Sequence, residues 1–140
     1  MVQVVTKTGD LGQTSIKDRR IDKTDDVIVL LGELDYINSL LGVYDNRPDY
    51  QTTLYAVMSH IAGYVDMPPA LEKVENEIRS LKYSDFIKDK FVVPRHTLHL
   101  IRASIRKAEI LAWKAKFEDV ARFLNRFSDL YFIRAEVFRG

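Results

Sequence analysis

The chain has 140 residues, of which 46% are hydrophobic, and this is enough apolar material for one domain with a buried core. Its 21 lysine and arginine residues are balanced by 20 aspartate and glutamate residues, so the net charge of +1 gives no general attraction to nucleic acid or to an anionic membrane. Because the sequence contains no cysteine, it excludes disulfides, thiolate metal sites and a cysteine nucleophile.

The histidines and the lengths of the apolar segments bear on metal binding and on membrane insertion. The three histidines, His60, His96 and His99, are not spaced with carboxylates as metal ligands usually are, so we expect no metal site made by the protein. The N-terminus lacks an apolar run of signal-peptide length, and we expect no segment to reach the roughly 20 apolar residues of a membrane span. We therefore expect a soluble, cytoplasmic protein that binds neither nucleic acid nor membranes.

Residues 1–24 do not have the pattern of a helix. Two glycines three positions apart stand among threonine and serine residues, which favours turns, so we expect a loop without strands. Glycines let backbone amides approach an anion and lysines add charge, so the segment is either a phosphate-binding loop or an ordinary polar arm. It is not a Walker A loop, because no glycine is followed by Lys-Ser or Lys-Thr at the required spacing. The residues concerned are Thr6, Lys7, Thr8, Gly9, Gly12, Thr14, Ser15, Lys17 and Lys23.

The first helix is expected over residues 26–44, with Thr24 and Asp25 as candidate N-caps. Its wide apolar face predicts that most of it is buried. Asp35 lies on the strip beside this face, where a carboxylate loses hydration unless it is paired. Arg102 is a candidate partner because it also borders an apolar stripe and can form a bidentate pair. A solvent-exposed Asp35 is the alternative.

Four more helical patterns follow, and no strand is convincing. They cover about residues 50–65, 70–81, 98–113 and 117–138, and Pro68-Pro69 ends the first of these four. Between the third and fourth helices of the chain, Phe91 and its apolar neighbours either cover the end of the core or line a ligand pocket. The sequence therefore predicts a single all-α domain, 1–140, in which an N-terminal loop (1–24) precedes an up-and-down five-helix bundle (25–140).

The helix at 98–113 carries charge at the edge of its apolar stripe. Arg102, Arg106 and Glu109 are separated by four and three residues and therefore share one face. Such a face is either a set of ion pairs within the bundle or an anion site. On the last helix, Asn125 and Asp129 are neighbours, and they form either a hydrogen-bond network between helices or a nucleotide contact.

Five motifs in this order resemble the PduO-type ATP:cob(I)alamin adenosyltransferases, also called corrinoid adenosyltransferases. They are TKTGDLGQTS near the N-terminus, Lys23, GELDYINSLLG, RASIRKAE and FLNRFSDLYF, and they span nearly the whole chain. The resemblance implies transfer of the 5′-deoxyadenosyl group of ATP to cob(I)alamin, giving adenosylcobalamin and triphosphate. It also implies a homotrimer with active sites between subunits, so that the N-terminal loop of one chain faces the 98–113 helix of its neighbour.

The resemblance assigns roles to individual residues. Arg102 and Asp35 match a structural salt bridge near the active site, and Phe91 matches an aromatic residue that helps to displace the lower axial ligand of the corrinoid. Ile110 stands where the family has an arginine. The positions that match ATP contacts are Thr6, Lys7, Thr8, Gly9, Thr14, Ser15, Lys23, Arg106, Lys107, Glu109 and Asn125.

The implied chemistry fits these residue types. The Co(I) of the corrinoid is itself the nucleophile that attacks the 5′ carbon of ATP, so no protein nucleophile is required. The protein must align ATP and neutralise the triphosphate, with bound Mg²⁺ and with Arg106, Lys23, Asp35 and Arg102 in or beside the catalytic site. A reductase and an adenosylcobalamin-dependent enzyme are the expected partners. The competing hypotheses are a trimeric bundle that binds ATP or corrinoid without transfer, and a helical interaction protein.

Overall fold

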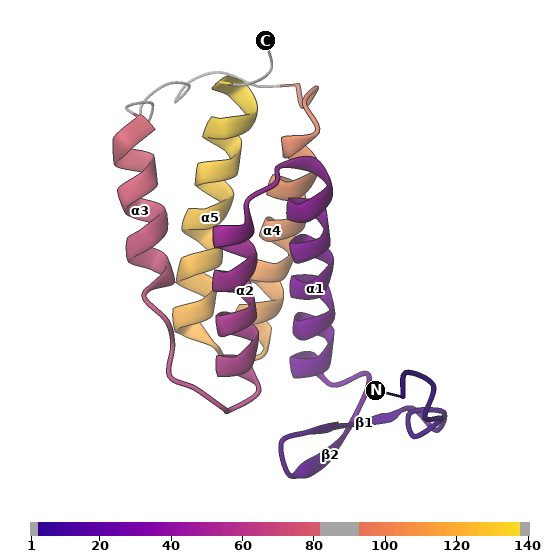
Figure 1. Cartoon of the computed structure of the whole chain (residues 1–140). Helices are drawn as coiled ribbons and strands as arrows, with labels where there is room; N and C mark the ends of the chain where they lie inside the picture. The colour runs from indigo at the N-terminus through magenta and orange to yellow at the C-terminus, as the bar shows by residue number, and fades with distance from the viewer. Residues whose placement is uncertain (1–2, 82–92, 138–140) are drawn as a thin grey trace.

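The structure is a computed structural model that describes residues 3–81 and 93–137, and it shows a helical bundle preceded by a β-hairpin (Figure 1). The all-α bundle predicted from the sequence is thereby confirmed. The elements are β1 (Gln13–Ile16), β2 (Arg19–Asp22), α1 (Asp26–Tyr44), α2 (Pro48–Ile61), α3 (Ala70–Leu81), α4 (Leu98–Lys114) and α5 (Glu118–Val137).

The helix boundaries agree closely with the sequence patterns, except in α2. Asp25 caps α1 as expected, because its Oδ1 accepts a hydrogen bond of 2.9 Å from the backbone N–H of Val27. The second helix starts two residues earlier than expected, with Pro48 in its first turn, where a missing N–H costs nothing. It stops before Gly63, whose φ of 94° is outside the helical region, so residues 62–65 are not helical.

The helices pack around one apolar core in which α4 is central. It lies between α1 and α5, while α2 packs on α1 and α3 packs on α5. The apolar positions predicted for α4 are buried, and an aromatic group from α2 and α5 fills the middle of the bundle. Its centre is Phe127, whose ring centroid lies about 5 Å from those of Tyr50, Phe123 and Tyr131.

The prediction of a loop without strands is wrong for residues 13–22. β1 and β2 form an antiparallel hairpin in which Gln13 pairs with Asp22 and Ile16 with Arg19. Lys17 turns the chain with a φ of 55°, and its Nζ donates a hydrogen bond of 3.0 Å to the carbonyl of Gly63, just after α2. Ile16 is buried. The hairpin is thus anchored to the end of the bundle, while the segment before it extends away from the helices (Figure 1).

The expectation that no segment approaches a membrane span is corrected by α1. This helix is long and apolar enough to cross a membrane, judged only by length and composition, and core helices of soluble proteins meet the same criterion. Leu30, Leu34 and Leu41 point into the bundle and are fully buried. Its other side carries the exposed apolar residues Val29, Tyr36 and Val43.

An ion-pair network ties the α1–α2 turn to α3 and α5. Asp45 accepts hydrogen bonds from Arg134 at 2.7 and 2.8 Å and from the Tyr131 hydroxyl at 2.6 Å. Arg47 donates to Glu77 at 2.6 and 2.9 Å, and Arg134 lies 3.6 Å from the same carboxylate. Because these groups join three segments of the chain, they fix the relative position of the helix ends.

Candidate functional site

The predicted site residues fall into two groups, and the first is the N-terminal arm, residues 3–23. Two successive turns fold residues 7–12, since Asp10 N–H donates to the Lys7 carbonyl and Gly12 N–H donates to the Gly9 carbonyl, each at 3.2 Å. The backbone N–H of Lys23 donates to the Gly12 carbonyl at 2.8 Å. A Cβ atom at Gly9 would lie 2.6 Å from Lys23 Nζ. The lysine ammonium therefore lies directly against the glycine, and a side chain at this position would displace it.

Arg20 holds the rest of the arm together, although the sequence analysis did not single it out. It donates a hydrogen bond of 2.9 Å to Ser15 Oγ, its partner across the hairpin, and another of 3.1 Å to the Thr8 carbonyl. The hydroxyls of Thr6 and Thr8 are 2.9 Å apart. Thus the structure brings Thr6, Thr8 and Ser15 together, and the cross-strand pairing that reveals Arg20 becomes visible only once the hairpin is recognised.

The second group lies where α4 and α5 run antiparallel. We call it the α4–α5 seam; its members are His99, Arg102, Arg106 and Glu109 of α4 and Asn125, Asp129, Phe132 and Glu136 of α5. His99 Nε2 is 2.8 Å from Glu136 Oε2 at its buried end. Seven residues away on each helix, Arg106 is close enough to Asp129 for its charge to oppose the rise that burial causes in the pKa of that carboxyl group. Glu109 and Asn125 each lie about one further helical turn along, so they are at similar heights on the two paired helices.

The seam is partly dehydrated and has an excess of unpaired cations. Burial lowers the pKa of Arg102, and the positive charge of Arg106 lowers it further. Burial raises the pKa of Asp129, against the opposing effects of Arg126 and Arg106. Within residues 3–81 and 93–137, neither Arg102 nor Arg106 has an ion-pair partner. Two neighbouring guanidinium groups without an ion-pair partner are suited to binding an anion.

The expected pairing of Asp35 with Arg102 is not found within the chain, whereas the alternative, a solvent-exposed Asp35, is. Asp35 is exposed on α1 and makes no ion pair with Arg102, whose Nε instead donates a hydrogen bond to His99 at 3.0 Å. Two other α1 carboxylates face α4: Glu33 lies 3.7 Å from Lys107 Nζ, and Asp26 lies 3.4 Å from Lys114 Nζ. Lys107 therefore lies on the α1 side of α4, away from Arg106 on the helix surface.

Phe91, the expected corrinoid-facing residue, lies outside the described residues. Thr14, half-buried in β1, and Lys7, with a φ of 63°, occupy the arm as expected. Asn125 is exposed on α5, and its carbonyl accepts a hydrogen bond from the hydroxyl of buried Ser128 at 2.7 Å.

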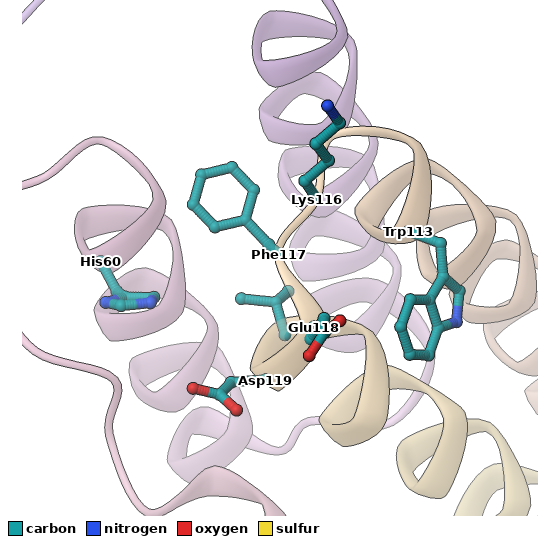
Figure 2. Close-up of a pocket in the computed structure, with 7 residues that line it drawn as sticks. His60, Trp113, Lys116, Phe117, Glu118 and Asp119 are labelled. Carbon is teal, nitrogen blue, oxygen red and sulfur yellow. The ribbon is translucent and has the colours of Figure 1, made fainter.

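A pocket of about 470 Å³ lies at the end of the bundle where α4 turns into α5 (Figure 2). His60 of α2 and Trp113 of α4 flank it, and Phe117 lies between them. None of the predicted site residues lines it. Among the described residues there is also no cluster of three or more histidine, aspartate or glutamate side chains that could hold a metal ion.

Comparison with known proteins identifies the family to which the chain belongs. A family model described as cobalamin adenosyltransferase matches residues 4–138. The chain belongs to this family. The match covers both the arm and the α4–α5 seam, so the resemblance seen in the five sequence motifs is confirmed.

Curated cobalamin adenosyltransferase relatives align along almost the whole chain. The cobalamin adenosyltransferase of Cupriavidus metallidurans is 28% identical over an alignment that covers 96% of this chain and 87% of the relative. The corrinoid adenosyltransferase of Bacillus subtilis is 26% identical, with coverage of 97% and 86%.

Solved structures share the fold. A variant of the PduO-type ATP:corrinoid adenosyltransferase from Lactobacillus reuteri, complexed with ATP, superposes with a TM-score of 0.81 at 23% identity, covering 96% of this chain and 93% of that one. A second variant, complexed with cobalamin and ATP, gives a TM-score of 0.79 at 24% identity, with coverage of 95% and 91%.

Proposed function

We propose that this member of the cobalamin adenosyltransferase family transfers the 5′-deoxyadenosyl group of ATP to cob(I)alamin and releases triphosphate. The observation that carries the proposal is the family match over residues 4–138. Relatives named corrinoid adenosyltransferases, and solved structures complexed with ATP and cobalamin, support the same reaction.

The residues of the chain suit the two tasks that the reaction leaves to the protein. The first is to hold ATP, for which the arm offers turns at residues 7–12 and the Lys23 ammonium. The second is to neutralise charge on the leaving triphosphate, for which Arg106 and Arg102 offer guanidinium groups in a partly dehydrated seam. Mg²⁺ bound to the triphosphate would share this neutralisation. Glu109 and Asn125 would orient the nucleotide beside Arg106.

The active site is proposed to form between subunits of a homotrimer. Residues 3–12 of the arm extend away from the helices of their own chain (Figure 1), so we place them against the α4–α5 seam of a second chain. The arm also exposes Val4, Val5 and Leu11, which are 89, 71 and 95% accessible. Apolar side chains this exposed need a covering surface. We further propose that the trimer is located in the cytoplasm, where ATP is abundant.

An anaerobic assay with cob(I)alamin, ATP and Mg²⁺ tests the proposed reaction. We expect the absorbance of cob(I)alamin to decay with formation of adenosylcobalamin and an equal amount of triphosphate. If ATP protects the arm from proteolysis but no transfer occurs, the chain is a binding bundle that has lost the reaction. The exposed Ile110, where the family has an arginine, is the observation that favours this alternative. If neither protection nor transfer is seen, the proposed function is wrong.

A further inference from the structure

His99 connects a buried carboxylate to Arg102. The side chains of His99 and Glu136 are 4 and 3% exposed, and His99 Nε2 lies 2.8 Å from Glu136 Oε2. On the other side of the ring, Arg102 Nε donates a hydrogen bond of 3.0 Å to His99 Nδ1. Phe132 packs edge-on against the imidazole, with ring centroids 5.7 Å apart. The ring is thus held by α4 and α5 together.

This arrangement determines which nitrogen of His99 carries the proton. An arginine is a donor only, so Nδ1 must present its lone pair to the Arg102 Nε–H. Nε2 then carries the hydrogen and donates it to the Glu136 carboxylate. A doubly protonated imidazole would place an N–H of Nδ1 against the N–H of Arg102. The described neighbours therefore select a neutral ring with the proton on Nε2.

The same contact limits what Arg102 can do. Its Nε is used by His99, so its two terminal amino groups remain to bind an oxyanion. The side chain is also partly dehydrated beside Arg106, which makes such a ligand more favourable. A guanidinium held at one edge loses less rotational freedom when it binds at the other edge.

We propose that His99, oriented by Glu136, is a positioning residue that holds Arg102 with its terminal amino groups directed at an oxyanion in the active site. This inference rests on the proposed function, because the oxyanion is either a phosphate of ATP or a carboxylate that a second copy of the chain brings to the assembled site. His99 itself touches neither substrate.

Two variants separate positioning from packing. In His99→Asn, the side-chain oxygen takes the place of Nδ1 and can accept from Arg102, but the side chain is too short to reach Glu136. In His99→Gln, the amide nitrogen takes the place of Nε2 and can donate to Glu136, but no acceptor faces Arg102. Each variant keeps one hydrogen bond and loses the ring packing on Phe132, so we expect similar losses of thermal stability.

The activities of the two variants should differ. We expect His99→Asn to keep kcat/KM for ATP within about threefold of the wild type, and His99→Gln to lose at least about tenfold. Arg102→Ala combined with His99→Gln should be no worse than Arg102→Ala alone, because the effect of His99 passes through Arg102. Equal activity of the two His99 variants, or higher activity of His99→Gln, would overturn the proposal.

Two measurements on His99→Gln distinguish the two sources of the oxyanion, a phosphate of ATP and a carboxylate of a second copy. A raised KM for ATP with unchanged mass by light scattering indicates a phosphate, whereas a lower mass at the same concentration indicates a carboxylate of a second copy. Either result supports the positioning role. Wild-type values of KM, kcat and mass in His99→Gln contradict it.

A spectroscopic test on the ligand-free protein is independent of turnover. With ¹⁵N-labelled histidine, Nδ1 of His99 should resonate as an unprotonated nitrogen that accepts a hydrogen bond, and Nε2 as a protonated one. Arg102→Ala should shift the Nδ1 signal and leave the neighbouring His96 signals unchanged. A protonated Nδ1 would overturn the proposal even in an active enzyme. An inactive wild type with the expected spectrum would instead show that the proposed function has failed.

Discussion

Among single residues, Arg106 has the clearest electrostatic role. Its charge acts on Arg102 and on Asp129, so it lies near the middle of the α4–α5 seam, and it has no ion-pair partner in the described part of the chain. If it neutralises the triphosphate, Arg106→Ala should reduce kcat/KM at least tenfold, about 1.4 kcal/mol of transition-state stabilisation, without loss of thermal stability. Arg79→Ala, which removes the same charge from the exposed surface of α3, is the matched control and should be fully active.

Gly9, in the N-terminal arm, allows a second test with single-residue variants, this time of ATP binding. Because a Cβ at this position would lie 2.6 Å from Lys23 Nζ, Gly9→Ala should displace the ammonium group while the rest of the arm keeps its turns. We expect ATP affinity, measured by calorimetric titration, to fall about tenfold, which corresponds to a loss of about 1.4 kcal/mol of binding free energy. Lys23→Ala should have a similar effect, and the double variant should be no weaker than the weaker single variant. Additive losses would mean that Gly9 and Lys23 act separately.

Residue-level prediction from the sequence succeeded where helical spacing alone decides the outcome. The spacing of Arg102, Arg106 and Glu109 was enough to place them on one face. It could not identify their partners, because the direction in which α1 faces α4 depends on the packing of the whole bundle. For that reason Asp35 was a candidate partner of Arg102, whereas Glu33 and Asp26 are the α1 carboxylates that form ion pairs with α4.

At the scale of helices and strands, the hairpin was missed for a local reason. A two-residue hairpin loop is usually recognised in a sequence by glycine or asparagine at the position with positive φ, but here Lys17 occupies that position. Strands of four residues also leave little alternation to detect. The helices were easier, since each has a cap, a proline or a long apolar stripe that marks it.

The ion-pair network between helix ends should make stability depend on pH in the acid range. Burial raises the pKa of Glu77, but the hydrogen bond and charge of Arg47, with the charge of Arg134, outweigh this effect and the net pKa is lowered. A lowered pKa in the folded state means that the stabilisation is fully present above the unfolded pKa, about 4.3, and is lost as the pH falls through the folded value. The hydrogen bond from Arg47 likewise lowers the pKa of Asp49.

Glu77→Gln should therefore be less stable than the wild type at neutral pH and should lose less further stability on acidification. Urea midpoints measured from about pH 6 to about pH 3 give this comparison. Glu118→Gln, a change at an exposed position in the first turn of α5, should follow the wild-type curve. Parallel curves for the wild type and Glu77→Gln would mean that the network does not carry the acid sensitivity.

For the whole molecule, the single chain leaves one side of the bundle uncovered. Val29, Tyr36 and Val43 are separated by seven residues, so they form a stripe along α1, and they are 42, 53 and 73% exposed. Leu100 and Ile110 of α4, the helix packed against α1, are also exposed, at 54 and 64%. Exposed apolar side chains on two neighbouring helices, together with an N-terminal segment that extends away from its own bundle, fit a closed assembly of identical chains.

Tyr36→Lys tests this assembly, because it places a charge in the middle of the α1 stripe without touching the core. We expect the wild type to have the mass of a trimer by light scattering at micromolar concentration, and the variant to be mostly monomeric. The variant should also lose transferase activity, because each proposed site needs an arm from one chain and a seam from another. Tyr55→Lys is the matched control, because Tyr55 is 61% exposed on α2, away from the stripe, and this variant should remain trimeric and active. A monomeric wild type with full activity would refute an active site shared between chains, whereas a trimeric and active Tyr36→Lys would move the interface to another face of the bundle.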